Sequence, residues 1–167
     1  MENERSSLLR SAGETRTFGR HLGALLRPGD WVALTGDLGS GKTTLVSGLV
    51  EGVHPGLRSR SPTYVRVEVY GSAPAVVHAD LYRLESDEEW ATLGIEDLAA
   101  EDAVVVIEWA DRATGRLPDS RLDLLLRWSD ESARELWIAP RGERWAAAVK
   151  DGALGRDRWG HALDPRS

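Results

Sequence analysis

Residues 36–43 have the types and spacing of a phosphate-binding loop. They read Gly-Asp-Leu-Gly-Ser-Gly-Lys-Thr, which satisfies the pattern Gly-x4-Gly-Lys-Thr. Glycines let backbone amides turn toward an anion, and a helix that begins at the end of such a loop adds its partial positive charge. We expect the Lys42 ammonium to reach the β- and γ-phosphates and the Thr43 hydroxyl to bind Mg²⁺. The expected nucleotide contacts are Asp37, Leu38, Gly39, Ser40, Gly41, Lys42, Thr43 and Thr44.

The flanking residues are those that a phosphate loop needs. An apolar run, Trp31 to Thr35, predicts a strand before the loop, and apolar residues at helical spacing follow it. The alternative is a glycine-rich turn that only links the two elements. Guanine-specific proteins also carry an Asn/Thr-Lys-x-Asp signature, and this chain has lysine only at positions 42 and 150. ATP is therefore the expected nucleotide.

Two acidic residues follow apolar strands and are candidates for the second acid that such a site requires. Glu108 follows the run 104–107, and Asp80 follows the run 76–79. The carboxyl ends of strands in an open α/β sheet form the edge where ligands bind. For each acid the alternative is a side chain that only faces water. We expect both to act in catalysis together with Lys42, one acid near Mg²⁺ and one near the attacking water, and their spacing leaves the division of roles open.

Three further features allow two interpretations each. Arginines flank the segment Ser-Pro-Thr-Tyr at 61–64. We interpret this region either as a solvated basic stretch or as a switch that senses the γ-phosphate or a partner. His78 has no second ligand residue at metal-binding spacing, so we interpret it as a packed or hydrogen-bonded strand residue without chemistry. Trp109 is either a core residue or a contact with the nucleotide or a partner. No arginine is evidently fixed at the site, so full activity needs Arg83, a loop arginine or a group from a partner.

Composition and charge restrict the class of protein. The chain has 167 residues, enough for one domain with a core, and its net charge of −6 argues against a general basic surface for nucleic acid. It has no cysteine, which excludes disulfides and thiolate metal sites and fits a reducing cytoplasm. The start, MENERSS, lacks the pattern of a secretory signal, and no apolar run is long enough to span a membrane.

Helix and strand signals predict a three-layer α/β domain around the site. Capping boxes begin helices at Ser11 and at Ser86, and apolar strands alternate with them. Residues 122–128 and 135–139 alternate about a polar turn and predict a C-terminal hairpin at the end of the sheet. The expected fold is P-loop NTPase-like, with a mixed, largely parallel sheet.

Four stretches in this order resemble the TsaE (YjeE) family. They are Gly-Asp-Leu-Gly-Ser-Gly-Lys-Thr-Thr at 36–44, Ser-Pro-Thr-Tyr at 61–64, His-Ala-Asp-Leu-Tyr-Arg-Leu at 78–84 and Ile-Glu-Trp-Ala-Asp at 107–111. With the opening helix and shorter matches, the resemblance covers about residues 10–140. The chain departs from the family at Ala79, where members often carry phenylalanine. This departure affects local packing and leaves the acid in place.

The resemblance implies a P-loop ATPase that acts with the TsaB–TsaD heterodimer in threonylcarbamoyl (t6A) modification of adenosine 37, in tRNAs that read codons beginning with A. ATP and Mg²⁺ are the implied cofactors, and tRNA is reached only through the partners. Residues 1–150 would form a single P-loop ATPase domain and 151–167 a flexible C-terminal tail. The roles implied are Glu108 as Mg²⁺ ligand with Thr43, Asp80 in hydrolysis, Thr15 beside adenine, and Thr63, Tyr64, Arg83 and Trp109 as switch or partner contacts.

Two other functions use the same loop. A small-molecule kinase would need an acceptor pocket and an arginine-bearing lid, for which only residues 51–66 or 81–101 leave room. A nucleotide-gated binding module would use ATP only as a switch that controls its binding to a partner, with little ATP turnover. The protein expected from all of these features is cytoplasmic and has no contact with a membrane.

Overall fold

Seven strands and five α-helices make up the part of the chain that the computed structural model describes, which is residues 5–59, 66–100 and 102–154. The strands are β1 (Arg5–Leu9), β2 (Trp31–Gly36), β3 (Val67–Tyr70), β4 (Val76–Asp80), β5 (Val104–Glu108), β6 (Arg121–Trp128) and β7 (Arg134–Arg141). The helices are α1 (Ala12–Leu25), α2 (Lys42–Val53), α3 (Asp87–Thr92), α4 (Ile95–Ala99) and α5 (Glu143–Lys150), with a short 3-10 helix η1 (Ala110–Ala113) after β5.

All seven strands belong to one sheet, in the order β1-β7-β6-β2-β5-β4-β3. Strands β6, β2, β5 and β4 are parallel, whereas β7 and β3 pair antiparallel with their neighbours. This order confirms the predicted mixed sheet and its β6–β7 hairpin. The hairpin is not at the end of the sheet, however, because β1 pairs with β7 beyond it. The polar start of the chain gave no strand signal, and β1 is a strand only through this pairing.

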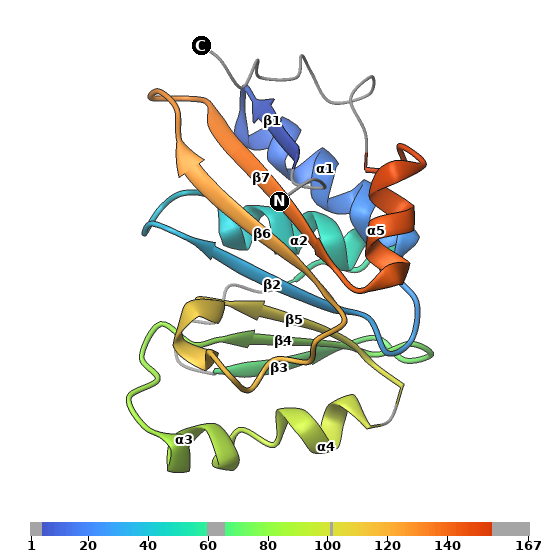
Figure 1. The fold of residues 1–167 in the computed structure, drawn as a ribbon, viewed down its shortest axis with the longest axis vertical. Coiled ribbons are helices and arrows are strands. Elements are labelled where there is room, and N and C mark those ends of the chain that lie inside the picture. The colour runs from blue at the N-terminus through green and yellow to red at the C-terminus, as the bar shows by residue number, and fades with distance from the viewer. Residues whose placement is uncertain (1–4, 60–65, 101, 155–167) are drawn as a thin grey trace.

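Alternation along the central strands divides the core between the two faces of the sheet. Val32 and Leu34 pack in the core beneath α1 and α2, and Ala33 between them packs in the core beneath α3 and α4. Figure 1 shows α1, α2 and α5 along one face of the sheet and α3 and α4 along the other. The predicted three-layer fold is confirmed, and β5 is its fully buried central strand.

Helices α1 and α2 are in unusually close contact because glycines face each other across their interface. A Cβ atom built on Gly48 would lie 2.0 Å from the carbonyl oxygen of Arg16, and one built on Gly19 would lie 2.1 Å from that of Leu45. Gly23 and Gly52, one turn further along each helix, are equally close to the opposite backbone. The contact fixes α2 against α1 and so fixes the direction in which the first turn of α2 points.

The C-terminal helix α5 was not predicted, and an ion pair attaches it to the loop before β2. Arg144 Nε donates to Asp30 Oδ1 at 2.6 Å, and its Nη2 donates to Oδ2. Trp145 and Val149 are buried in the core of the α1 and α2 face. Leu154 is also buried there, and residues 155–167 of the expected tail lie outside the described residues.

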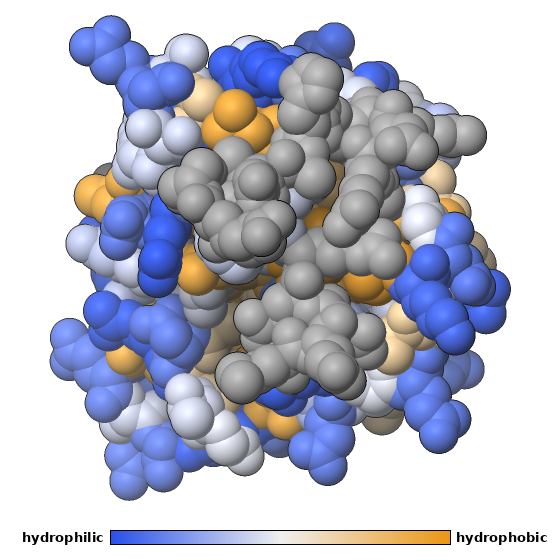
Figure 2. Space-filling model, turned by 45° about the horizontal axis from the view of Figure 1, so that its top comes forward, coloured by the Kyte–Doolittle hydropathy of each residue, from blue (hydrophilic) through white to orange (hydrophobic). Residues whose placement is uncertain are grey.

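Hydrophilic residues occupy most of the periphery of the surface in Figure 2, with smaller hydrophobic areas between them. Among the described helices, none combines the length and the apolar character needed to cross a membrane.

Candidate functional site

The glycine-rich loop joins β2 to α2 in a conformation that only glycines adopt easily. Gly36, Gly39 and Gly41 have φ values of 137°, 76° and 104°. A Cβ atom on Gly36 would also lie 2.1 Å from the carbonyl oxygen of Leu126. The helix begins at Lys42 without a side-chain cap, so its first amides are left for another acceptor. This local geometry is that of an anion-binding loop.

The Lys42 ammonium lies inside the curve of this loop. Its Nζ donates to the carbonyl oxygens of Gly36 at 2.7 Å and Asp37 at 2.9 Å. The same atom is 4.0 Å from the centroid of the Trp109 ring. Burial lowers the pKa of Lys42 from its ordinary value, and nearby carboxylates, Glu108 foremost, oppose this shift. Among the described residues no carboxylate forms an ion pair with this cation, and a phosphate placed here would supply that charge partner.

Glu108 connects β5 to the first turn of α2. Its Oε2 accepts a hydrogen bond from Thr43 Oγ1 at 3.0 Å, and its Oε1 lies 2.9 Å from His78 Nε2. Alternation places Glu108 on the same face of β5 as Val104 and Val106, which is the face covered by α2. The residue is 1% exposed. A carboxylate and a hydroxyl oxygen thus meet beside the loop, and hard oxygen ligands are those that Mg²⁺ prefers.

Asp80 lies beside Glu108 at the carboxyl edge of the sheet. The two residues are register partners in the parallel pair of β4 and β5. The side chain of Asp80 is only partly buried, and its Oδ1 accepts from the backbone amide of Tyr82 at 2.9 Å. Asp80 and Glu108 therefore differ in environment, since one is close to solvent and the other is enclosed against Thr43. The strand-end rule predicted both acids at this edge, and the pairing of β4 with β5 shows that they are neighbours there.

Trp109 turns the chain sharply at the end of β5. Its φ of 57° is in the left-handed region, which is unusual for a bulky residue. The ring covers Lys42 on one side and lies 4.9 Å from the ring of Tyr82, centroid to centroid. Tyr82 is 44% exposed. Trp109 also packs against the core of the α3 and α4 face, so the structure shows both a core contact and a contact with the phosphate loop, and a role toward nucleotide or partner stays a prediction.

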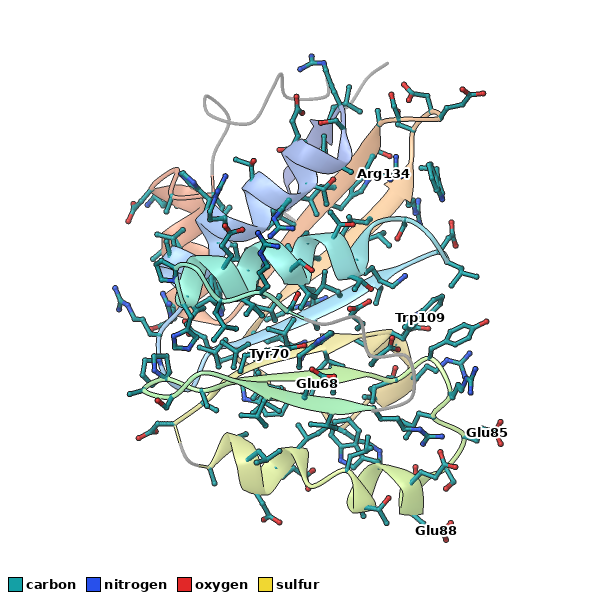
Figure 3. All side chains as sticks on the ribbon, turned by 180° about the vertical axis from the view of Figure 1, so that it is seen from behind. Glu68, Tyr70, Glu85, Glu88, Trp109 and Arg134 are labelled. Carbon is teal, nitrogen blue, oxygen red and sulfur yellow. The ribbon has the colours of Figure 1, made fainter. Side chains whose placement is uncertain are left out.

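Two further residues contact this region. His78 is the hydrogen-bonded strand residue that the sequence predicted, and sequence reasoning missed only its partner, Glu108; the period-two alternation that puts His78 on the same face as Asp80 was the available signal. Arg134 was missed altogether. Arg134 of β7 donates from Nε to the carbonyl oxygen of Ser40 at 3.0 Å and stacks on Trp128 at 3.6 Å. No motif marked Arg134. Figure 3 shows Arg134 and Trp109 at the end of the sheet where α2 begins, on opposite sides of the loop.

The remaining predicted residues are placed as follows. Thr15 of α1 is buried, and its methyl carbon would lie 3.7 Å from a Cβ atom on Gly41, so α1 does reach the loop. Leu38 is 70% exposed, and Thr44 is partly buried in the first turn of α2. Arg83 is exposed, with its carbonyl oxygen accepting from Arg66. Thr63 and Tyr64 lie outside the described residues.

The residues present fit a nucleotide and a magnesium ion. In the described part of the chain, two buried polar atoms have no hydrogen-bond partner. They are the Ser40 hydroxyl in the loop and His78 Nδ1 in β4. Among the described residues, no three His, Cys, Asp or Glu side chains are grouped as a metal site.

Comparison with known proteins gives consistent results across most of the chain. The family model "Threonylcarbamoyl adenosine biosynthesis protein TsaE" matches residues 9–136. The "tRNA threonylcarbamoyladenosine biosynthesis protein TsaE" of Streptomyces coelicolor is 39% identical over 141 residues, which cover 80% of this chain and 95% of that protein. The protein of the same name from Treponema pallidum is 35% identical over 130 residues, covering 78% and 96%.

A solved structure has the same architecture. The crystal structure of YdiB from Bacillus subtilis matches with a TM-score of 0.74 at 25% sequence identity, covering 89% of this chain and 93% of that one. The family match spans the phosphate loop, both strand-end acids and most of the hairpin. This chain belongs to the TsaE family of threonylcarbamoyl adenosine biosynthesis proteins.

Proposed function

We propose that the protein is a magnesium-dependent ATPase that supports threonylcarbamoyl modification of adenosine 37 in tRNA, acting in the cytoplasm with the TsaB–TsaD pair. The names of its relatives support the pathway. Its net charge of −6 supports a division of labour in which the partners hold the tRNA. The two lysines of the chain, Lys42 and Lys150, do not stand in an Asn/Thr-Lys-x-Asp signature, which supports ATP rather than GTP as the nucleotide.

The observation that carries the proposal is the contact between Thr43 and Glu108 beside Lys42. A turn that merely linked β2 to α2 would have no need of a buried acid at its helical end, because burying a carboxylate is costly unless it is paired. Here the carboxylate is enclosed, hydrogen-bonded to the predicted magnesium-binding hydroxyl, and close enough to Lys42 to oppose the fall in its pKa. With ATP bound, Mg²⁺ and the Lys42 ammonium would offset part of the phosphate charge, and Glu108 would pair with the magnesium ion.

Each side chain then has a distinct task. The loop amides and Lys42 bind the phosphates and stabilise charge that develops on the transferring group. Bound Mg²⁺ would neutralise phosphate charge and orient the β- and γ-oxygens. Thr43 and Glu108 would hold it, directly or through water. We propose that Asp80, the more accessible acid, orients the attacking water; its partial exposure beside the buried Glu108 supports this division of roles.

Completion of the site by a partner is consistent with the surface around it. Tyr82 and Leu38 are exposed beside the loop, and Arg83 is exposed as well. The guanidinium of Arg112 lies 5.9 Å from the centroid of the Tyr82 ring. We therefore propose slow hydrolysis by the isolated chain and faster hydrolysis when the partners supply or position an arginine.

The kinase alternative receives no support from the described residues. A kinase would need residues 51–66 or 81–101 for its acceptor pocket and lid. Most of the second segment forms α3 and α4, whose Trp90 and Ile95 pack on the face of the sheet opposite α2. Of the first segment, residues 51–53 complete α2. The nucleotide-gated binding module uses the same residues as the ATPase and is distinguished from it by experiment.

The test is ATP hydrolysis by the purified chain, alone and with TsaB, TsaD and a cognate tRNA. The variants Asp80→Ala and Glu108→Ala are measured beside the wild type, with Glu88→Gln as the matched control. Glu88 is an exposed acid of α3 that points away from the site, as Figure 3 shows. Stimulation that both site variants abolish and the control retains supports the proposal. Tight ATP binding without hydrolysis in any mixture would refute the ATPase role in favour of the nucleotide-gated binding module.

A further inference from the structure

We propose that His78 is a positioning residue that fixes the Glu108 carboxylate for magnesium binding. The inference rests on the proposed function, because it assigns a role at the same site. His78 would not touch Mg²⁺ or the nucleotide itself. It contacts Glu108, which would hold the ion.

The carboxylate of Glu108 has one donor on each oxygen. His78 Nε2 is 2.9 Å from Oε1, and Thr43 Oγ1 is 3.0 Å from Oε2. The side chains of His78 and Glu108 are 1% and 2% exposed, so water does not compete for this hydrogen bond. With both oxygens held, rotation about the last bond of Glu108 is restricted. Without His78 only Thr43 would remain, and Thr43 is itself the residue that Mg²⁺ would engage.

The hydrogen bonding of the imidazole ring indicates which nitrogen carries the proton. His78 Nδ1 is buried and has no hydrogen-bond partner among the described residues. A buried N–H without an acceptor is costly, whereas a bare ring nitrogen is less so. The proton therefore belongs on Nε2, where it donates to Glu108.

The ring is also held in place from its other side. Tyr70 stacks against it, with the ring centroids 6.3 Å apart and an interplanar angle of 26°. The Tyr70 hydroxyl donates to Glu68 Oε2 at 2.8 Å, which fixes Tyr70 in turn. In the sheet, Glu68 is the register partner of His78. Figure 3 shows Glu68 and Tyr70 together on β3. The outermost strand thus supports the histidine, which supports the acid.

The substitution His78→Leu removes the donor and puts an apolar side chain of similar size in its place. His78→Gln restores a donor at nearly the position of Nε2. His54→Leu is the control, because His54 Nε2 also has a hydrogen-bond partner, the Pro74 carbonyl oxygen at 2.8 Å, in a part-buried position at the far end of α2. Titration calorimetry measures Mg²⁺ binding to each full-length chain with a non-hydrolysable ATP analogue. Analogue binding without Mg²⁺ is measured separately.

For His78→Leu we expect Mg²⁺ affinity to fall by about ten- to a hundred-fold, the range typical of lost supporting hydrogen bonds at metal sites. Affinity for the analogue without Mg²⁺ should change less than about two-fold, because the loop is untouched. His78→Gln should recover most of the loss, and His54→Leu should bind Mg²⁺ as the wild type does. In a Glu108→Gln background, His78→Leu should add little further loss.

Nitrogen NMR of the wild-type chain gives a second readout, independent of metal and nucleotide. A proton on His78 Nε2 supports the inference, and a bare Nε2 overturns it even where His78→Leu does not fold. Wild-type Mg²⁺ affinity in a folded His78→Leu chain, or full additivity with Glu108→Gln, also overturns it. A wild type that binds no Mg²⁺ with the analogue would instead refute the proposed function itself.

Discussion

The glycine contact between α1 and α2 makes a quantitative prediction about stability. In Gly48→Ala the new methyl group would lie 2.0 Å from the Arg16 carbonyl oxygen and 3.0 Å from the Arg20 amide nitrogen. Ordinary contact begins at 3.4 Å, so the two helices would have to separate by about 1.4 Å. Because the opposing atoms are backbone, no side-chain rotation can relieve the clash.

The expected cost follows from two opposing effects. Alanine gains about 1 kcal/mol over glycine in helix propensity. Overpacking against a fixed wall costs about 1–3 kcal/mol and sometimes more, and a backbone clash belongs at the upper end. A cost of about 3 kcal/mol against a gain of about 1 kcal/mol leaves a net loss of about 2 kcal/mol in the free energy of unfolding. For a chain of this size that is a fall of about 4–8 °C in Tm.

Urea denaturation of the full chain measures this loss, with Gly13→Ala as the control. Like Gly48 of α2, Gly13 of α1 is a helical glycine. A Cβ atom on Gly13 would meet only Ser11 Oγ at 3.5 Å, which is an ordinary contact. Gly13→Ala should therefore stabilise the chain by about 0.4–1 kcal/mol. If Gly48→Ala also stabilised the chain, or changed stability by less than about 0.5 kcal/mol, the close contact between the helices would be refuted.

Three further predictions concern charged groups. Lys42→Met should weaken ATP binding by about ten- to a hundred-fold, since a charge-assisted phosphate contact is worth about 1.5–3 kcal/mol, as measured by calorimetry. Arg144→Leu should cost about 2–3 kcal/mol in urea denaturation because it leaves the 6% exposed Asp30 carboxylate without its cation. The hydrogen bond from Arg66 lowers the pKa of Glu89, so this carboxylate adds stability above the unfolded-state pKa of about 4.3. That contribution disappears as pH falls through the lower folded-state pKa, and Glu89→Gln should remove this part of the acid dependence of Tm.

Each of these variants has a matched control elsewhere in the chain. Lys150→Met changes the only other lysine and should leave ATP binding unaltered. Arg141→Leu removes a half-exposed arginine and should cost less than about 1 kcal/mol. Glu88→Gln should leave the acid dependence of Tm as it is in the wild type. Equal effects in a variant and its control would contradict the corresponding contact.

Local signals in the sequence were sufficient for the elements that carry the site. Ser11 caps α1, with its Oγ accepting from the amide of Glu14, as the capping box predicted. The rule that parallel strands end at one edge correctly placed both Asp80 and Glu108 at the carboxyl edge, and only the strand order made them neighbours. These inferences succeeded because each depends on residues that are close in sequence, or on an apolar strand long enough to be unmistakable.

The parts that were missed depend on contacts between distant segments. Arg134 reaches Ser40 across 94 positions, and Arg144 reaches Asp30 across 114. His78 has chemical meaning only once β4 lies beside β5, which puts Glu108 within reach of its ring. Helix α5 has a tryptophan and a valine on its buried side, a pattern too short to distinguish from a loop.

The position of β1 has a consequence for how the protein behaves in concentrated solution. Without this strand, the eight-residue β7 would be the border of the sheet, with a row of unpaired amides and carbonyls from Arg134 to Ile138. Such borders are templates for pairing between molecules. The five residues Arg5–Leu9 cover that border, and at the opposite one β3 is only four residues long and carries Glu68. A chain that begins after Leu9 would retain every residue of the nucleotide site and would be expected to self-associate through β7.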